Sequence, residues 1–438
     1  MKKKISLIAL FTICLFSQAR AHDVLSIEDA IILGMENNFN IQIAQNQAEI
    51  SSLNKSFGNA GFLPSLEISG IRSDSYEDNL IIDNGVSTGT QRSDIMNRSA
   101  AINMNWTIFD GMRMFSNYNR LSELENLNHT EASIEVERII TDIVISYYNI
   151  VRQQKSLGVL ETAVETSEER VQIAETKREL GSGSEYELLL AQTDLNADQA
   201  AVIRQEVVLN DAKMEIIRLL DLEAHADFEI VQEINLLEQI SLDEAFTGAV
   251  QNNHQIEAAN TRTSVSKLEV QETRRARYPE IDLNIGYTMN RNKTDAARLL
   301  VEEIDGPAIG FTARFNLFDG FNINSQIQIA KINHRNNQIE LDEQLKSIET
   351  RVSSEFKNYT STRRLVELEQ ENLELAEQTL EIALERFTFA TITSIELRES
   401  QRILIDTENR LITSQYEAKI SETELLRLSG NLLEEFGF

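Results

Sequence analysis

The chain has 438 residues, of which 70 are acidic and 41 basic, and its formal net charge at pH 7 is −29. A chain this acidic is not expected to bind nucleic acid through its bulk charge. Its five histidines show no metal-ligand spacing, and the sequence contains neither a glycine-rich phosphate loop nor a Gly-x-Ser-x-Gly motif. We therefore expect no catalytic residues, no cofactor and no metal site.

Residues 1–21 are predicted to be a secretory signal peptide. A basic start at residues 2–4 is followed by an apolar stretch at 5–16 and by an Ala-Arg-Ala cleavage sequence. Cys14 leaves a lipoprotein open as the alternative, although its neighbours fit a lipidation signal poorly. A mature chain that begins at His22 contains no cysteine and no apolar run of about 18 residues. We expect an exported protein without disulfides, which can enter a membrane only as a β-barrel.

The sequence also indicates a tandem duplication. Three segments recur in the same order and in nearly the same register: Leu25–Ala30 as Ile240–Ala245, Pro64 as Pro279, and Phe109–Gly111 as Phe318–Gly320. We place the first repeat at residues 22–234 and the second at 235–438. Each repeat is predicted to contain a helix, two strands and a long helical hairpin. The period is far longer than that of solenoid repeats.

Each proline that opens a repeat's second part is followed by alternating apolar and polar residues. The apolar positions are Leu66 and Ile68, then Ile102, Met104, Trp106 and Ile108, then Ile281, Leu283, Ile285 and Tyr287, then Ile309, Phe311, Ala313, Phe315 and Leu317. A period of two predicts strands with one apolar and one polar face, and runs of about 10 residues match tilted membrane-crossing strands. Four such strands cannot close a barrel without leaving unpaired edges in lipid. The chain must therefore share its barrel with copies of itself. A barrel of two chains would have eight strands, and a barrel of three chains would have twelve.

The stretch after each Phe-Asp-Gly triplet contains no proline, which permits very long helices. Apolar residues at three- and four-residue spacing predict a coiled-coil seam in each hairpin. The seam positions are Leu157, Leu160, Val164, Val171, Ala174, Leu188, Ala191, Leu195 and Val202 in the first repeat, and Leu373, Ala376, Leu380, Ala383, Phe387, Leu397, Ser400, Leu404 and Leu411 in the second. Asp198 and Thr407 interrupt the seam. The hairpins break at residues 181–183 and 390–393.

These parts, in this order, resemble the TolC-like outer membrane efflux protein family over essentially the whole mature chain. The Phe-Asp-Gly triplets carry the resemblance, together with a Ser/Thr-x-x-Glu-Leu segment at Ser184–Leu188 and Thr393–Leu397, followed by Gln192 or Gln401. The resemblance implies an α+β membrane protein with two transmembrane strands and a coiled-coil hairpin in each repeat. It also implies a homotrimer, whose twelve-stranded barrel in the cell outer membrane continues into a periplasmic α-helical barrel.

The same resemblance implies a function. Such channels dock onto a periplasmic adaptor (membrane fusion) protein and an inner-membrane transporter, and they pass small molecules from the periplasm to the exterior. Export of polypeptides by type I secretion remains open, because the sequence does not reveal the cargo. An exported coiled-coil scaffold or adhesin is the alternative from a different class, although it has no need of four two-faced strands.

Glu187, Glu396 and Glu399 are the residues that this resemblance places at the narrow periplasmic entrance. Three chains would form an acidic ring there that favours cations. Glu396 and Glu399 are three residues apart and therefore share a helix face. The alternative is a solvated helix surface in a chain rich in glutamate.

The resemblance further implies that the hairpin tips contact the adaptor: Leu180, Gly181 and Ser182 in the first hairpin, and Phe389, Ala390 and Thr391 in the second. Ordinary hairpin turns explain the same residues, and the second tip lacks glycine. Some relatives have a basic residue where Ile392 stands. An ionic latch at the entrance would therefore have to use Arg386 or Arg398, or be absent.

Two further sets of residues lie close to the predicted strands. Arg274, Arg275 and Arg277 form either a basic collar at the inner membrane face or the basic end of a helix, which suits the helix dipole. Trp106 and Tyr287 resemble aromatic anchors at a membrane interface.

Overall fold

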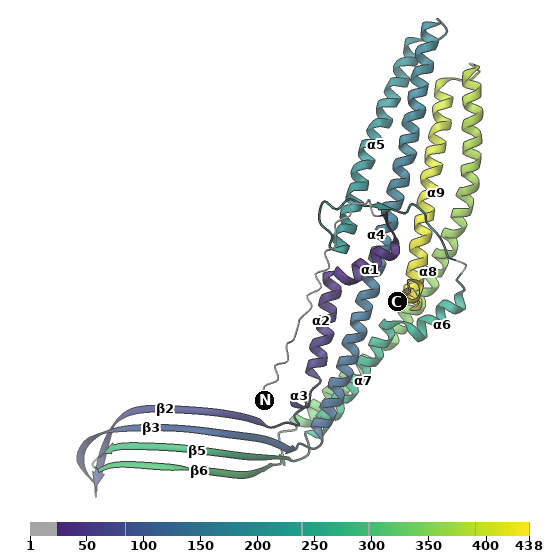
Figure 1. The fold of residues 1–438 in the computed structure, drawn as a ribbon. Coiled ribbons are helices and arrows are strands. Elements are labelled where there is room, and N and C mark those ends of the chain that lie inside the picture. The colour runs from purple at the N-terminus through teal and green to yellow at the C-terminus, as the bar shows by residue number, and fades with distance from the viewer. Residues whose placement is uncertain (1–23, 84, 238–239, 297, 390, 438) are drawn as a thin grey trace, which may run out of the picture. The chain divides into compact units, whose positions relative to one another are not determined.

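The computed structural model describes residues 24–83, 85–237, 240–296, 298–389 and 391–437 (Figure 1). The expected signal peptide lies outside these residues. Contacts divide the described chain into two units: unit 1 falls within residues 1–38, 139–238 and 358–423, and unit 2 within residues 39–138, 239–357 and 424–438. None of the described helices is both long enough and apolar enough to span a bilayer.

Unit 2 contains a four-stranded antiparallel sheet. Its strands are β2 (Ser65–Asp83), β3 (Val86–Phe109), β5 (Glu280–Ala296) and β6 (Arg298–Arg314), in the order β2-β3-β5-β6 (Figure 1). The four predicted strands are confirmed, but they are longer than expected because the polar segments between the apolar runs are strand as well. The last run was predicted to reach Leu317, whereas β6 ends at Arg314. The neighbouring strand β5 begins at Glu280, which lies opposite Arg314. Residues 315–317 therefore have no β5 residue opposite them with which to pair.

The register gives this sheet two different faces. One face carries apolar rows across all four strands: Leu66, Met104, Ile285 and Ile309 in one row, and Ile68, Ile102, Tyr287 and Pro307 in the next. The other face is joined by polar side chains: Thr107 Oγ1 donates to Asp282 at 2.8 Å, and Asn284 Nδ2 donates to Thr312 Oγ1 at 3.2 Å. Among the described residues, β2 and β6 each pair with one strand only, so the sheet has two open edges.

The two Phe-Asp-Gly triplets form the turns from strand to helix. Asp110 accepts a hydrogen bond from the backbone N–H of Met114 at 2.8 Å, and Asp319 accepts one from Ile323 at 2.7 Å. These side chains satisfy donors that the first turn of a helix leaves without partners. Each following glycine has a positive φ, which a residue without Cβ adopts at little cost. The triplets therefore start α4 (Arg113–Glu179) and α8 (Asn322–Thr388), which have 67 residues each.

The shorter helices of unit 2 are α2 (Phe39–Asn54), α3 (Phe57–Ala60), α6 (Leu242–Asn252), α7 (His254–Arg275) and α10 (Leu432–Glu435). The predicted basic group lies at the C-terminal end of α7, where two of its members contact the strand-to-helix turns. Arg275 donates to the carbonyl oxygen of Met112, and Arg277 donates to Asn324. These two arginines therefore connect the end of α7 by hydrogen bonds to the places where the strands are followed by the long helices.

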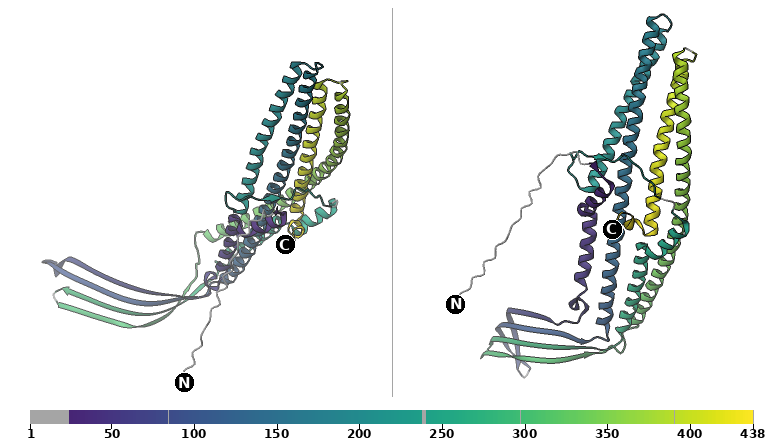
Figure 2. Two further views of the ribbon diagram at one scale, coloured as in Figure 1. Left: turned by 45° about the horizontal axis from the view of Figure 1, so that its top comes forward. Right: turned by 45° about the vertical axis from the view of Figure 1, so that its right-hand side comes forward.

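Unit 1 consists of α1 (Ile27–Asn37), α5 (Glu185–Leu220), parts of α4, α8 and α9 (Ser394–Ser429), and the two-residue strands β1 (Val24–Leu25) and β4 (Glu229–Ile230), which pair in parallel. Within this unit, α4 with α5 and α8 with α9 form antiparallel hairpins (Figure 2). Most predicted seam positions near the hairpin tips are buried, including Ala174, Leu188, Ala191, Ala383, Phe387 and Leu397. The coiled-coil prediction is thereby confirmed for the hairpins.

Two buried asparagines tie helix ends together. Asn38 Nδ2 donates to the carbonyl oxygen of Leu219 near the end of α5 in unit 1, and Asn253 Nδ2 donates to Leu428 near the end of α9 in unit 2, both at 2.9 Å. The last carbonyls of a helix have no partner inside the helix. Each asparagine thus satisfies a carbonyl near a helix end where the chain is buried.

Candidate functional site

The tip of the first hairpin is a tight turn. Gly181 has φ +71°, and the backbone N–H groups of Gly181 and Ser182 donate to the carbonyls of Arg178 and Lys177 at 3.0 and 2.9 Å. This pattern satisfies the last carbonyls of α4 and uses the left-handed conformation that glycine favours. Leu180 next to it is 76% exposed. The tip therefore exposes an apolar side chain to solvent on a hydrogen-bonded turn.

The second tip ends without a glycine. Both the backbone N–H and the hydroxyl of Thr391 donate to the carbonyl oxygen of Arg386, at 2.9 and 2.8 Å, which replaces the glycine turn by a side-chain cap. Phe389 is 79% exposed, and Ala390 lies outside the described residues. Ile392 packs against the apolar cluster of Phe387 and Leu397, which explains an aliphatic residue at this position.

The two hairpins of unit 1 contact each other close to their tips. Lys177 of α4 donates from Nζ to the carbonyl oxygen of Phe387 in α8 at 3.2 Å, and its ammonium lies 3.8 Å from the centre of the Phe387 ring. Ile173 of α4 packs on the same apolar cluster of the second hairpin. These contacts join the two hairpins close to their tips.

Glu187 and Glu396 each begin the returning helix of a hairpin. The Glu187 carboxylate accepts from the backbone N–H of Ser184 at 3.3 Å, while Ser184 Oγ accepts from the Glu187 N–H at 3.2 Å. Glu396 forms the same reciprocal cap with Thr393, at 2.7 and 3.3 Å. Hydrogen bonds from the Thr393 backbone and hydroxyl lower the pKa of Glu396. Both carboxylates are exposed to solvent. Each of them caps the start of a helix, and this role does not depend on a position at an entrance.

Glu399 has a different partner. Arg402, one turn further along α9, donates to its carboxylate at 2.7 Å and lowers the pKa of Glu399 through this hydrogen bond. The side chain remains exposed. Glu396 and Glu399 therefore both stay ionised at neutral pH in a single chain.

The same hairpins also contain a buried polar cluster, which no sequence pattern predicted. Asp198 of α5 accepts two hydrogen bonds from the guanidinium of Arg398 in α9, both at 2.7 Å, and a third from the hydroxyl of Ser167 in α4 at 2.6 Å. Asp198 is 8% exposed. The paired carboxylate raises the pKa of Arg398 further through these hydrogen bonds.

The cluster continues one turn towards the tips. Arg170 of α4 donates to Asp194 of α5 at 2.9 Å and to the side-chain oxygen of Gln401 in α9 at 3.1 Å. Arg170 and Gln401 are 3% and 4% exposed. Gln401 is the glutamine that follows the second Ser/Thr-x-x-Glu-Leu segment. Its position in the sequence is thus explained by a contact that joins the second hairpin to the first.

The buried cluster explains why Asp198 interrupts the predicted seam, and it gives Arg398 a partner within its own chain. Asp198 interrupts the predicted seam because it serves the buried cluster instead of apolar packing. Arg398, one candidate for an ionic latch, pairs with Asp198 of its own chain. An acidic residue at a seam position was the only sequence signal for this cluster, and the sequence did not indicate the partner.

We expect Asp198→Ala to destabilise unit 1 by about 2–3 kcal/mol, because it leaves the partly buried Arg398 guanidinium without its charged acceptor. Chemical unfolding of the purified protein measures the change. Asp406→Ala is the matched control: Asp406 lies on the same helix as Arg398, 3.7 Å from the exposed Arg402. Loss of such an exposed pair costs about 0–1 kcal/mol. Equal effects of the two substitutions would contradict a special role for Asp198.

The sequence pattern of the outer membrane efflux protein family matches residues 34–220 and 247–431. Among solved structures, the Campylobacter jejuni outer membrane channel CmeC has a TM-score of 0.78 at 16% identity, over 93% of this chain and 86% of that chain. A membrane protein from Pseudomonas aeruginosa has a TM-score of 0.76 at 14% identity, over 92% and 90%. The outer membrane protein VceC from Vibrio cholerae has 0.74 at 14% identity, over 92% and 96%. No curated protein matches the sequence.

The two-faced sheet and the paired helical hairpins are therefore the fold of outer-membrane channel proteins. The family pattern covers most of the chain, and the chain belongs to the outer membrane efflux protein family. This family consists of efflux channels, not of enzymes. The expectation of an efflux channel is thus confirmed, and nothing in the fold or the family match favours a coiled-coil adhesin.

Proposed function

We propose that this efflux channel works as a homotrimer, in which three copies of the sheet form a twelve-stranded barrel in the outer membrane. The open four-stranded sheet carries this proposal. Its two edges have no partner among the described residues, and its apolar face is exposed over several rows. Both features are costly unless neighbouring chains pair with the edges and lipid covers the apolar face. That the barrel contains three chains is what the family resemblance implies.

A tandem duplication supports the same assembly. The helices α4 and α8 have 67 residues each, and α5 and α9 have 36 residues each, so the two halves of the chain contribute hairpins of equal length. Three chains would then supply six similar hairpins, enough for a closed α-helical barrel in the periplasm. We place the boundary between the repeats near residue 235, in the linker that precedes α6.

We further propose that the hairpin tips meet a periplasmic adaptor, which connects the channel to an inner-membrane transporter. The exposed Leu180 and Phe389 support this, because exposed apolar side chains at hairpin tips are suited to contact a partner. Small molecules are the cargo that membership of an efflux family supports best. Polypeptide export is the second candidate, although no observed feature favours it.

The trimer is tested by native mass spectrometry of the protein extracted from membranes in detergent. We expect a mass of three chains and, after reconstitution into planar bilayers, a water-filled conductance. A protein that is monomeric and soluble without detergent would contradict the proposal.

At the entrance, we propose that Glu396 and Glu399 form an acidic ring, to which Glu187 also contributes. The lowered pKa of Glu396 and of Glu399 supports a ring that stays charged at neutral pH. Because the pKa values of Glu396 and Glu399 lie below the ordinary value in the folded chain, each carboxylate keeps its charge to a lower pH than an ordinary glutamate does. Such a ring would attract cations and repel anions.

We expect the double substitution of Glu396→Gln and Glu399→Gln to reduce cation selectivity, with single-channel reversal potentials in a salt gradient as the measurement. Each glutamine retains hydrogen-bonding capacity, so the trimer should form in normal yield. Glu381→Gln with Glu385→Gln is the matched control, since these carboxylates lie on the preceding helix α8. Unchanged selectivity in the first variant would assign Glu396 and Glu399 to helix capping and solvation alone.

A further inference from the structure

The helices of unit 2 that adjoin the sheet form a layer with two outer members. Side-chain contacts join α2 to α4, α4 to α7 and α7 to α8: Lys55 with Glu125 at 2.6 Å, Arg120 with Glu272 at 3.0 Å, and Ser266 with His334 at 2.9 Å. Figure 1 shows α2 and α7 on opposite sides of α4. The order in the layer is therefore α2-α4-α7-α8, and α2 and α8 are its outer helices.

Each outer helix has two apolar faces. In α2, Ile41 and Ala48 are buried on one face, and the opposite face carries apolar residues that are 49–70% exposed: Phe39, Ile43, Ile50 and Leu53. In the part of α8 that belongs to unit 2, Ile327 and Ile348 are buried, and the opposite face carries apolar residues that are 52–58% exposed: Ile329, Ile332 and Ile339. A surface helix ordinarily has one apolar and one polar face. The second apolar face is therefore suited to contact a further helix.

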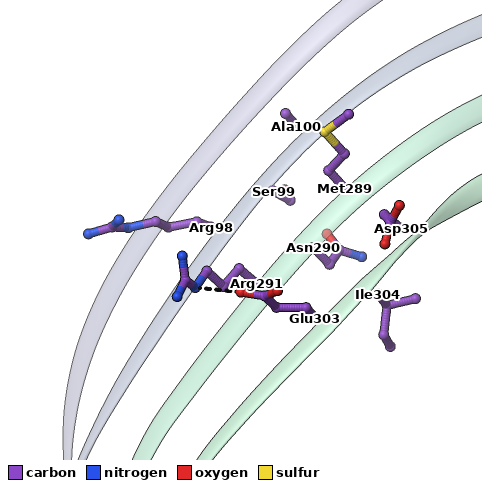
Figure 3. Close-up of a pocket in the computed structure, with 9 residues that line it drawn as sticks. All are labelled: Arg98, Ser99, Ala100, Met289, Asn290, Arg291, Glu303, Ile304 and Asp305. Atoms are coloured by element: carbon purple, nitrogen blue, oxygen red, sulfur yellow. Dashed lines mark ion pairs between the residues drawn. The ribbon is translucent and has the colours of Figure 1, made fainter.

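Each outer helix is connected along the chain to an open edge of the sheet. α2 is followed by α3 and β2, and β6 is followed by α8. On one edge β6 is joined to β5 by pairs such as Arg291 with Glu303 at 3.0 Å (Figure 3), whereas its other edge has no partner among the described residues. One side of unit 2 thus combines β2 with α2, and the other combines β6 with α8. Two different sides suit a head-to-tail arrangement of copies, which can close a ring.

The contact between α7 and α4 provides a template for a contact between chains. Pro64 recurs 215 residues later as Pro279, and Phe109 recurs 209 residues later as Phe318. In the proposed duplication, α2 therefore corresponds to α7, and α4 corresponds to α8. Within the chain, α7 lies between α4 and α8. By the same plan, α2 would lie between its own α4 and the α8 of a neighbouring chain.

The exposed face of α2 agrees with this template. Ile50 corresponds to Val265 of α7, which is buried. Val265 shares a helix face with His254, eleven residues earlier, and His254 pairs with Glu137 of α4 at 2.7 Å. The face that α7 turns towards α4 is therefore the face that α2 leaves exposed.

The side chains of the two contacts are also matched in kind. Glu272 of α7 and Arg120 of α4 form an ion pair. The corresponding residues are Phe57, which directly follows α2, and Ile329 of α8, and they are 57% and 54% exposed. Both partners of an ion pair are thus replaced by apolar residues. Replacement of one partner alone would leave the other charge unpaired in the contact, so the joint replacement favours a contact between Phe57 and Ile329.

We propose that the exposed apolar face of α2 in one chain packs against the exposed apolar face of α8 in the next chain, with Phe57 beside Ile329. Leu53 lies one turn before Phe57, and Ile332 lies one turn after Ile329. Because α2 runs towards the sheet and α8 runs away from it, the contact is antiparallel and places Leu53 beside Ile332. This inference rests on the proposed homotrimer and names the surfaces of unit 2 that meet in it. A ring of three chains contains the contact three times.

The test is disulfide cross-linking between chains. Cys14 is the only cysteine in the sequence, so a chain with Cys14→Ser contains none. In this background we expect Leu53→Cys combined with Ile332→Cys to form, on oxidation in membranes, species of two and three linked chains on non-reducing gels. Each single-cysteine variant should remain at the mass of one chain. Both side chains are exposed in the single chain, so the substitutions leave its core intact.

Leu53→Cys combined with Lys331→Cys is the matched control. Lys331 is exposed and precedes Ile332, but it lies about 100° around the helix and therefore off the apolar face. This pair should give little linked product, and equal linking by both pairs would overturn the proposed contact. Native mass spectrometry of the unoxidised samples reports the trimer separately. A mass of three chains without links from the Ile332 pair would overturn the contact and leave the trimer intact, whereas a wild-type mass of one chain would overturn both.

Discussion

Replacement of Gly111 by alanine is expected to have the largest effect of any single substitution considered for this protein. Gly111 has φ +72°, and a Cβ added there would lie 2.5 Å from Tyr278 Cβ and 2.7 Å from the carbonyl oxygen of Arg275. The left-handed conformation costs an L-residue about 1–2 kcal/mol. Displacing the packed neighbours costs about 1–3 kcal/mol more. We therefore expect a loss of about 2–5 kcal/mol per chain, measured by chemical unfolding.

The second Phe-Asp-Gly triplet provides a matched control for this substitution. Gly320 occupies the corresponding turn with φ +69°, but no described atom lies within 4 Å of an added Cβ. Gly320→Ala should therefore cost only the conformational strain of about 1–2 kcal/mol. If the two alanine substitutions lowered the free energy of unfolding equally, the contact between the first turn and the end of α7 would not contribute to stability.

A charge on the apolar face is expected to have the second largest effect. Met104 lies in the row of Leu66, Ile285 and Ile309, about halfway along the apolar band. In the proposed barrel this row faces the centre of the bilayer. Arginine at the midplane of a barrel costs about 2–4 kcal/mol per chain. We expect Met104→Arg to reduce the amount of trimer in the outer membrane strongly, as measured by extraction and native mass spectrometry.

The neighbouring residue is the control for the face of the strand. Asn103 precedes Met104 in β3 and therefore lies on the polar face, opposite Gly286 of β5. Asn103→Arg should leave the amount of trimer close to that of the wild type, because this face would line a water-filled lumen. If both substitutions reduce the trimer equally, the apolar face does not contact lipid. If only Asn103→Arg does so, the register is wrong by one residue.

The sequence alone determined those features of the protein that rest on local patterns. Alternation of apolar and polar residues identified the strands and their two faces, and the Phe-Asp-Gly triplets marked the starts of the long helices. Helix caps follow equally local patterns: Ser184 and Ser241 stand three residues before Glu187 and Glu244, with which they form reciprocal caps in the structure. Such signals are readable because a strand face or a helix cap depends on residues within a few positions of each other.

Strand length was less predictable, because pairing with a neighbour extends a strand through polar sequence that has no alternation. The tandem duplication and its boundary, inferred from recurring segments, remain predictions, as do the adaptor contact of the hairpin tips and the acidic ring. The family resemblance supplied these last two, since no local pattern distinguishes an entrance glutamate from a solvated one.

Only the tertiary structure decided which distant residues meet. Asp198 and Arg398 are 200 positions apart, and their pair forms because α5 and α9 lie side by side in unit 1. The apolar row of Leu66, Met104, Ile285 and Ile309 depends on the register of four strands from both halves of the chain. The period of two determines the face of the sheet on which a side chain lies. It does not determine which residue of the neighbouring strand lies opposite that side chain. The opposite residue is set by the pairing of the whole sheet, which places the apolar residues of neighbouring strands in common rows.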